Sequence, residues 1–122
     1  MSAAATNLVS ELTQRGETLS FCESLTAGLA SATVASVPGA SAVLRGGLIT
    51  YATEVKSHFL RQPVADIEAA GVVSGDTALA MARAAVAETD ADWGIGLTGV
   101  AGPDRQEGKP AGTVYILSLI HI

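Results

Sequence analysis

Hydrophobic residues along the chain follow two spacings, one typical of helices and one typical of short strands. Leu8, Val9 and Leu12 recur at helical spacing, which predicts a helix over residues 3–15 that ends at Gly16. Further helices are expected over residues 25–36, 53–60, 63–70 and 74–88, with Thr53 and Ser74 as the N-caps of two of them.

Short apolar runs predict four strands, over residues 18–22, 43–51, 93–99 and 113–120. In the third run, bulky Trp93, Ile95 and Leu97 alternate with two glycines, so one face carries bulk and the other permits close contact with a helix. Strands that alternate with helices predict an α/β fold: a single domain over residues 1–122, built as a three-layer α/β/α sandwich with a largely parallel, mixed sheet.

The composition fits a folded domain and argues against several classes of protein. The chain has 122 residues, of which 48% are apolar and 16% charged, enough for one domain with a real core. Seven Lys and Arg against twelve Asp and Glu leave little material for a basic surface, so we expect no nucleic-acid partner. No run approaches the roughly 18 apolar residues of a membrane span, so we expect no membrane association.

The cysteine and histidine content fits a cytosolic protein and indicates no metal site. Cys22 is the one cysteine, which excludes an internal disulfide and fits the cytosol. The first 17 residues lack a basic region followed by an apolar block, so we expect no secretory signal and a cytoplasmic location. His58 and His121 belong to no spacing typical of a metal site, and we expect no metal or organic cofactor.

Polar residues follow each of the first three predicted strands. The segments are "ESLTAG" after the first strand, "TYATEVK" after the second and "TGVAGPD" after the third. In open α/β sheets, ligands collect beyond the carboxyl ends of parallel strands. The three segments are therefore expected to converge on one site.

Ser24 lies where the first strand is expected to pass into a helix. The free N–H groups of a helix start can stabilise an oxyanion or hold a phosphate, which would suit a nucleophilic serine. An ordinary N-cap at Ser24 or Thr26 is the alternative, and the local sequence leaves both open. Glu23 can orient Ser24 or Lys56, or simply complement the helix N-terminus.

Lys56 is expected in the first turn of the helix that Thr53 would cap. The positive helix end and partial burial both lower the pKa of an ammonium, which favours a neutral amine able to act as a base. Tyr51 lies at the end of the preceding strand and can donate a hydrogen bond to a reacting oxygen. A solvated lysine and a tyrosine at the rim are the alternative.

The third segment is a glycine-containing loop. Gly99 and Gly102 allow a sharp turn and a close approach of the backbone to a ligand, or merely a tight connection to the next strand. Lys109 can pair with a phosphate or be an ordinary loop charge.

Four blocks of this sequence resemble the CinA C-terminal domain family, in the order and spacing of that family, from about residue 17 to residue 117. They are "ESLTAG" at 23–28, "GGLITYATEVK" at 46–56, "GVVS" at 71–74, and "TGVAGP" at 98–103 together with "KPAGTVY" at 109–115. Leu25 and Ala27 replace the usual Cys and Gly of the first block, and Ala52 and Thr53 replace Ser and Asn of the second. The "DRQEGKP" loop stands where many relatives are glycine-rich.

The resemblance implies an amidohydrolase, a nicotinamide-nucleotide amidase of pyridine-nucleotide salvage, that converts nicotinamide mononucleotide to nicotinate mononucleotide and ammonia. Ser24 would be the nucleophile, Lys56 its general base and Tyr51 an assisting residue. Substrate contacts are implied for Glu23, Thr26, Gly28, Gly47, Thr98, Gly99, Ala101, Gly102 and Lys109. The implied partner is this small nucleotide; a homo-oligomer and fusion or relation to a larger CinA-type protein stay open.

The end of the chain departs from the family pattern. Family members continue with a further strand, a helix and basic residues, whereas "SLIHI" at residues 118–122 does not resemble them, so we expect a truncated domain with a non-native tail. Two alternatives to catalysis follow: a non-catalytic nucleotide-binding domain, inactive because incomplete, and an oligomerisation module of a larger protein.

Overall fold

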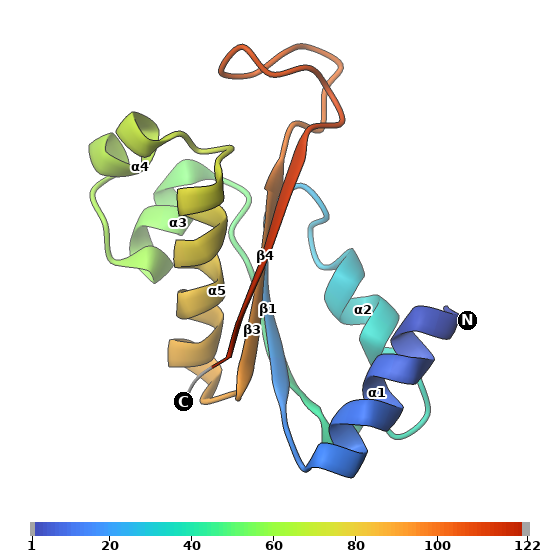
Figure 1. Ribbon diagram of the computed structural model, residues 1–122. Coiled ribbons are helices and arrows are strands. Elements are labelled where there is room, and N and C mark those ends of the chain that lie inside the picture. The colour runs from blue at the N-terminus through green and yellow to red at the C-terminus, as the bar shows by residue number, and fades with distance from the viewer. Residues whose placement is uncertain (1, 121–122) are drawn as a thin grey trace.

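The computed structural model describes residues 2–120 and has three layers, with helices on both faces of one sheet (Figure 1). The sheet order is β2-β1-β3-β4. Its strands are β1 (Leu19–Glu23), β2 (Leu44–Ile49), β3 (Trp93–Gly99) and β4 (Val114–Ile120). Strand β1 is parallel to β2 and β3, while β4 is antiparallel to β3. The predicted α/β fold with a mixed, largely parallel sheet is confirmed.

The helices divide between the two faces of the sheet as Figure 1 shows. On one face lie α1 (Ala3–Arg15) and α2 (Leu29–Ala35), followed by a short 3₁₀ turn, η1 (Ala40–Ala42). On the other lie α3 (Thr53–Leu60), α4 (Val64–Ala70) and α5 (Gly75–Thr89). Gly16 ends α1 in the left-handed conformation, and Ser74 caps α5 by accepting from the Thr77 N–H at 3.1 Å, both as predicted.

No helix within residues 2–120 combines the length and the apolar character needed to cross a membrane.

Bulky residues and glycines alternate along β3, and this alternation determines how helices pack on the two faces of the sheet. A Cβ at Gly94 or Gly96 would collide with the backbone carbonyl groups of Ala82 and Ala78, so α5 lies directly against this face. Leu97 on the opposite face is buried, and partly buried Ile95 packs on the same core, which includes residues of α1 and α2. The predicted division of β3 into a glycine face and a bulky face is confirmed.

One predicted helix start and one predicted N-cap are wrong. Helix α2 begins at Leu29 rather than at residue 25, because Ala27 and Gly28 have positive φ angles of 49° and 102° and interrupt a helix there. Gly28, not Ser24 or Thr26, is the N-cap residue of α2. Helix α3 has Ala52 at its N-cap without a side-chain hydrogen bond, and Thr53 is already helical.

Strand β4 is an edge strand and includes residues 118–120 of the segment expected to be a tail. His121 and Ile122 lie outside the described residues. The face of β4 away from α5 exposes Val114, Ile116 and Ile120, with Ile116 61% exposed.

The register between β1 and β2 slips by one residue, since Leu19 pairs with Leu44 and Ser20 with Gly46.

Candidate active site

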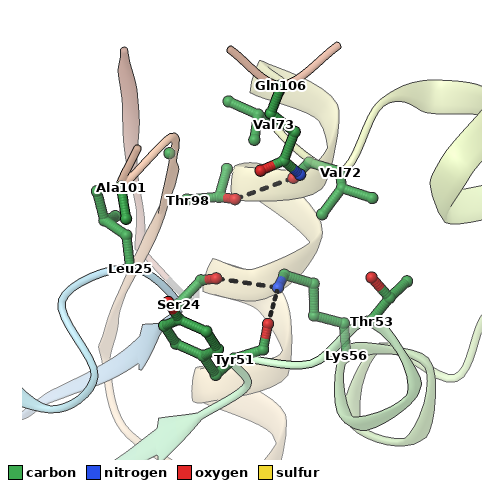
Figure 2. Close-up of a pocket in the computed structure, with 11 residues that line it drawn as sticks. Ser24, Leu25, Tyr51, Thr53, Lys56, Val72, Val73, Thr98, Ala101 and Gln106 are labelled. Atoms are coloured by element: carbon green, nitrogen blue, oxygen red, sulfur yellow. Dashed lines mark hydrogen bonds between the residues drawn. The ribbon is translucent and has the colours of Figure 1, made fainter. Parts of the chain in front are cut away.

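A pocket of about 110 Å³ opens where the carboxyl ends of β1, β2 and β3 meet (Figure 2). Residues from all three strand-end segments line it, as the shared direction of these strands requires. The lining consists of Ser24, Leu25, Tyr51, Thr53, Lys56, Val72, Val73, Thr98, Gly99, Ala101 and Gln106. The predicted convergence of the three segments is confirmed.

Ser24 and Lys56 are in direct contact within this pocket. The Lys56 Nζ lies 3.0 Å from the Ser24 Oγ, across 32 residues of sequence. The same Nζ donates to the backbone carbonyl groups of Thr50 at 2.8 Å and Tyr51 at 3.1 Å. Both side chains are withdrawn from solvent, with Ser24 7% and Lys56 1% exposed. A hydroxyl and an amine at this distance meet the geometric requirement for a nucleophile and its base.

Burial shifts Lys56 towards its neutral amine form. Burial lowers the pKa of Lys56, because the charged ammonium loses its hydration. Two of its three contacts are carbonyl oxygens, which can only accept hydrogen bonds. A neutral amine has two N–H groups for these two carbonyls and one lone pair, which then faces the Ser24 hydroxyl. In this neutral form the lysine can receive the proton of Ser24.

Glu23 organises the segment that follows Ser24. Its carboxylate is fully buried and accepts from the hydroxyl groups of Thr26 and Ser31, each at 2.6 Å. It also accepts from the backbone N–H groups of Gly28 at 3.2 Å, Ala30 at 2.9 Å and Ser31 at 2.9 Å. Burial alone would raise the pKa of Glu23, but these hydrogen bonds outweigh it, and the net pKa lies below its usual value.

The start of α2 is consequently not available as an oxyanion site. Its first free N–H groups bind the Glu23 carboxylate, and the N–H of Ser24 donates to the Leu97 carbonyl at 3.0 Å. Ser24 lies in the turn between β1 and α2, four residues before the N-cap. The expectation that Ser24 stands on a helix N-terminus is therefore wrong, because α2 begins only at Leu29 and a buried carboxylate satisfies its N–H groups.

Tyr51 and Thr98 hold different places in the pocket. Tyr51 is 61% exposed at the rim, and its carbonyl accepts from Lys56. Thr98 is fully buried and donates from its Oγ1 to the Val72 carbonyl at 2.9 Å, which joins β3 to the segment before α5. Gly99 permits a close approach, since a Cβ there would lie 2.6 Å from the Thr113 carbonyl oxygen.

The structure brings together half of the predicted site residues. Ser24, Tyr51, Lys56, Thr98, Gly99 and Ala101 line the pocket. The other six do not. Thr26 and Gly28 donate to the Glu23 carboxylate, and Gly47 faces Ser31. Gly102 and Lys109 lie in the β3–β4 loop outside the lining.

Sequence reasoning missed Leu25, Val72, Val73 and Gln106 as lining residues and took Thr53 for a cap. Val72 and Val73 belong to the "GVVS" block and Thr98 to the "TGVAGP" block. The occurrence of both blocks in the sequence could have predicted that these residues form one wall of the pocket. No local pattern marked Gln106, whose place depends on the path of the whole β3–β4 loop.

Cys22 is buried next to this site. Burial raises the pKa of the Cys22 thiol to about 11, so the thiol stays protonated beside Thr50 and Lys56. Within residues 2–120, no group of three or more His, Cys, Asp and Glu side chains is placed to hold a metal ion.

A family profile described as the CinA C-terminal domain matches residues 1–121. The chain belongs to the CinA C-terminal domain family. Proteins of Streptococcus pneumoniae named as competence-damage inducible are similar to it: the one from strain ATCC 700669 / Spain 23F-1 is 52% identical over 112 residues, or 92% of this chain. The chain spans 27% of the length of that protein, so it is related to larger CinA-type proteins.

Solved structures of CinA-type proteins have the same fold. The competence/damage inducible protein CihA from Agrobacterium tumefaciens aligns with a TM-score of 0.88 at 32% identity, over 95% of this chain and 71% of that one. A competence-damaged protein (CinA) superfamily protein from Klebsiella pneumoniae 700603 aligns with a TM-score of 0.90 at 28% identity, over 95% and 73% of the two chains.

Proposed function

We propose that this CinA C-terminal domain is an amidohydrolase that converts nicotinamide mononucleotide to nicotinate mononucleotide and ammonia. The observation that carries the proposal is the buried contact between the Ser24 Oγ and the Lys56 Nζ at 3.0 Å. The substrate class comes from the family resemblance of the blocks around these two residues.

In the first half of the reaction, Ser24 attacks the carboxamide carbon. The neutral Lys56 amine takes the hydroxyl proton as the Oγ–C bond forms, which gives a tetrahedral intermediate. The resulting Lys56 ammonium returns this proton to the amide nitrogen. The C–N bond then breaks, ammonia leaves, and an ester between the nicotinoyl group and Ser24 remains.

In the second half, water cleaves this ester. Lys56, again neutral, takes a proton from the water as its oxygen attacks the acyl carbon, and returns that proton to the Ser24 Oγ as the ester bond breaks. Nicotinate mononucleotide leaves and the enzyme is restored. Tyr51 at the rim would assist by holding the substrate against the two catalytic residues.

The charge of the substrate suits this arrangement. The pyridinium ring withdraws electrons from the carboxamide and makes its carbon more electrophilic. A cation close to Lys56 also disfavours its protonated form, in the same direction as burial. Substrate binding would thus maintain the neutral amine that the first step needs.

Ammonia release from nicotinamide mononucleotide by the purified chain tests the proposal. Ser24→Ala and Lys56→Met should each lower kcat/KM at least about thousandfold, because each removes one partner of the dyad. Arg15→Met, which removes an exposed cation on α1 outside the pocket lining, should retain activity. Full activity of Ser24→Ala would rule out the covalent route, and binding of the nucleotide without ammonia release would indicate a non-catalytic binding domain.

A further inference from the structure

The loop between β3 and β4 ends in a small closed turn. Gln106 and Lys109 each donate a backbone N–H to the carbonyl of the other, at 3.0 and 2.8 Å. Glu107 and Gly108 form the turn between them, both with positive φ angles, of 53° and 74°. The two-residue loops of tight hairpins also have both central residues in the left-handed region. The tip of the loop is therefore held in a hydrogen-bonded turn, and this turn includes the pocket-lining residue Gln106.

Glu107 ties this turn to the segment before α5. Its Oε2 accepts from the Val72 N–H at 2.7 Å and its Oε1 from the Val73 N–H at 3.0 Å. Two consecutive backbone N–H groups thus hold one carboxylate through both oxygens, which is a charge-assisted pair of hydrogen bonds. The Glu107 side chain is only 26% exposed, and the Lys109 Nζ lies 3.8 Å away. We call this pair of bonds the Glu107 clamp.

The residue next to the clamp forms a wall of the pocket. Gln106 lines the pocket together with Val72 and Val73, and Figure 2 shows its side chain directed towards Val72 and Thr98. Its carboxamide makes no hydrogen bond to any residue within 2–120, although it carries two donors and one acceptor. Those groups are free to bind a ligand that reaches Ser24 and Lys56.

We propose that Glu107 is a positioning residue: the Glu107 clamp holds the β3–β4 loop against the segment before α5 and so places Gln106 to hydrogen-bond the substrate. The role of Gln106 rests on the proposed function, whereas the clamp does not. The clamp joins the two segments that flank the pocket on this side, 34 and 35 residues apart in sequence. Its loss frees the turn and removes the support for the Gln106 side chain.

Limited trypsin digestion tests the clamp without any substrate. Arg105 provides a cleavable bond in the loop, whereas Lys109 precedes Pro110 and resists trypsin. Glu107→Ala should speed cleavage after Arg105 by about fivefold or more, because cleavage follows the population of the open loop. Cleavage after Arg83, which lies within α5, should stay unchanged and so exclude general unfolding. Asp104→Ala, which removes an exposed carboxylate of the same loop, serves as the matched control.

Steady-state kinetics with nicotinamide mononucleotide test Gln106. Gln106→Ala should raise KM about tenfold and leave kcat within about twofold, as expected for the loss of a hydrogen bond made equally to bound substrate and transition state. Glu107→Ala should raise KM in the same way, although Glu107 does not line the pocket. Gln106→Ala should leave the cleavage rate after Arg105 unchanged. This result would distinguish the loss of the substrate contact of Gln106 from the loss of the Glu107 clamp.

The two proposals fail in different ways. Equal cleavage after Arg105 in the parent chain and in Glu107→Ala would overturn the clamp, whatever the enzymatic result. Ammonia release by the parent chain with an unchanged KM in Gln106→Ala would overturn the substrate contact and leave the proposed function in place. Absence of ammonia release by the parent chain would overturn the proposed function and the contact together, while the digestion still decides the clamp.

Discussion

The Glu23 carboxylate binds Ser31 twice, accepting from its Oγ at 2.6 Å and from its backbone N–H at 2.9 Å. These bonds join the end of β1 to the first turn of α2. The turn that carries Ser24 lies between the two joined ends. The position of Ser24 opposite Lys56 therefore depends on a carboxylate that has no place in the pocket itself.

Glu23→Gln should lower the free energy of unfolding by about 2–4 kcal/mol, because an amide nitrogen cannot accept from the buried N–H and O–H groups around it. Urea unfolding followed by circular dichroism measures this change. Glu68→Gln, an exposed position on α4, should change the same quantity by about 0.5 kcal/mol or less. A Glu23→Gln protein as stable as the parent chain would contradict the organising role of this carboxylate.

The rate of ammonia release should rise with pH as Lys56 loses its proton. Below the pKa of Lys56, kcat/KM should increase about tenfold per pH unit, since one proton must leave before the amine can act as a base. Because burial lowers the pKa of Lys56, the rate should level off below pH 10.5, the ordinary value for lysine. Initial rates over a series of buffers give the midpoint.

Lys109→Gln should show the same midpoint as the parent chain, since Lys109 lies outside the pocket lining. A profile that is flat from acid to alkaline pH, or one whose midpoint moves with Lys109, would exclude Lys56 as the general base.

Stability should also depend on the pH through Lys56. The unfolded chain keeps the lysine proton up to about pH 10.5, while the folded chain releases it at a lower pH because burial lowers the pKa. Between these two values the lysine of the unfolded state binds more protons, so the Lys56 contribution to the free energy of unfolding rises with pH, by at most about 1.4 kcal/mol per unit.

Lys56→Met lacks this contribution. The stability of the parent chain relative to Lys56→Met should therefore increase as the pH is raised through that window, as urea unfolding at several pH values would measure. Parallel stability curves for the two proteins would show that burial does not perturb the lysine.

Gly96→Ala should destabilise the domain by about 3 kcal/mol or more. The new Cβ would overlap the Ala78 carbonyl oxygen and lie 2.8 Å from the Ala82 nitrogen, both backbone atoms of α5 that cannot move aside cheaply. Gly75→Ala is the matched control, because a Cβ there meets no atom within 4 Å and should change stability by about 1 kcal/mol or less. Equal thermal midpoints for the two variants would contradict the close packing of α5 on β3.

The layers of the fold follow from local patterns in the chain. The period-two alternation in residues 93–99 was sufficient to predict that one face of β3 would meet a helix closely, since side chains of a strand point alternately to its two faces. Parallel strands bring their carboxyl ends to one edge, so the sequence also predicted that Ser24, Lys56 and Thr98 would meet.

Hydrogen bonds between segments distant in sequence could not be predicted from such local patterns. A carboxylate at the end of a strand has no characteristic pattern. The burial of Glu23 and the late start of α2 depend on how the backbone of residues 26–31 folds around this carboxylate. The place of Gln106 depends on Glu107 reaching Val72 and Val73, 34–35 residues away in sequence. Local propensities concern neighbouring residues, whereas these hydrogen bonds form only when the packed sheet and helices bring their partners within about 3 Å.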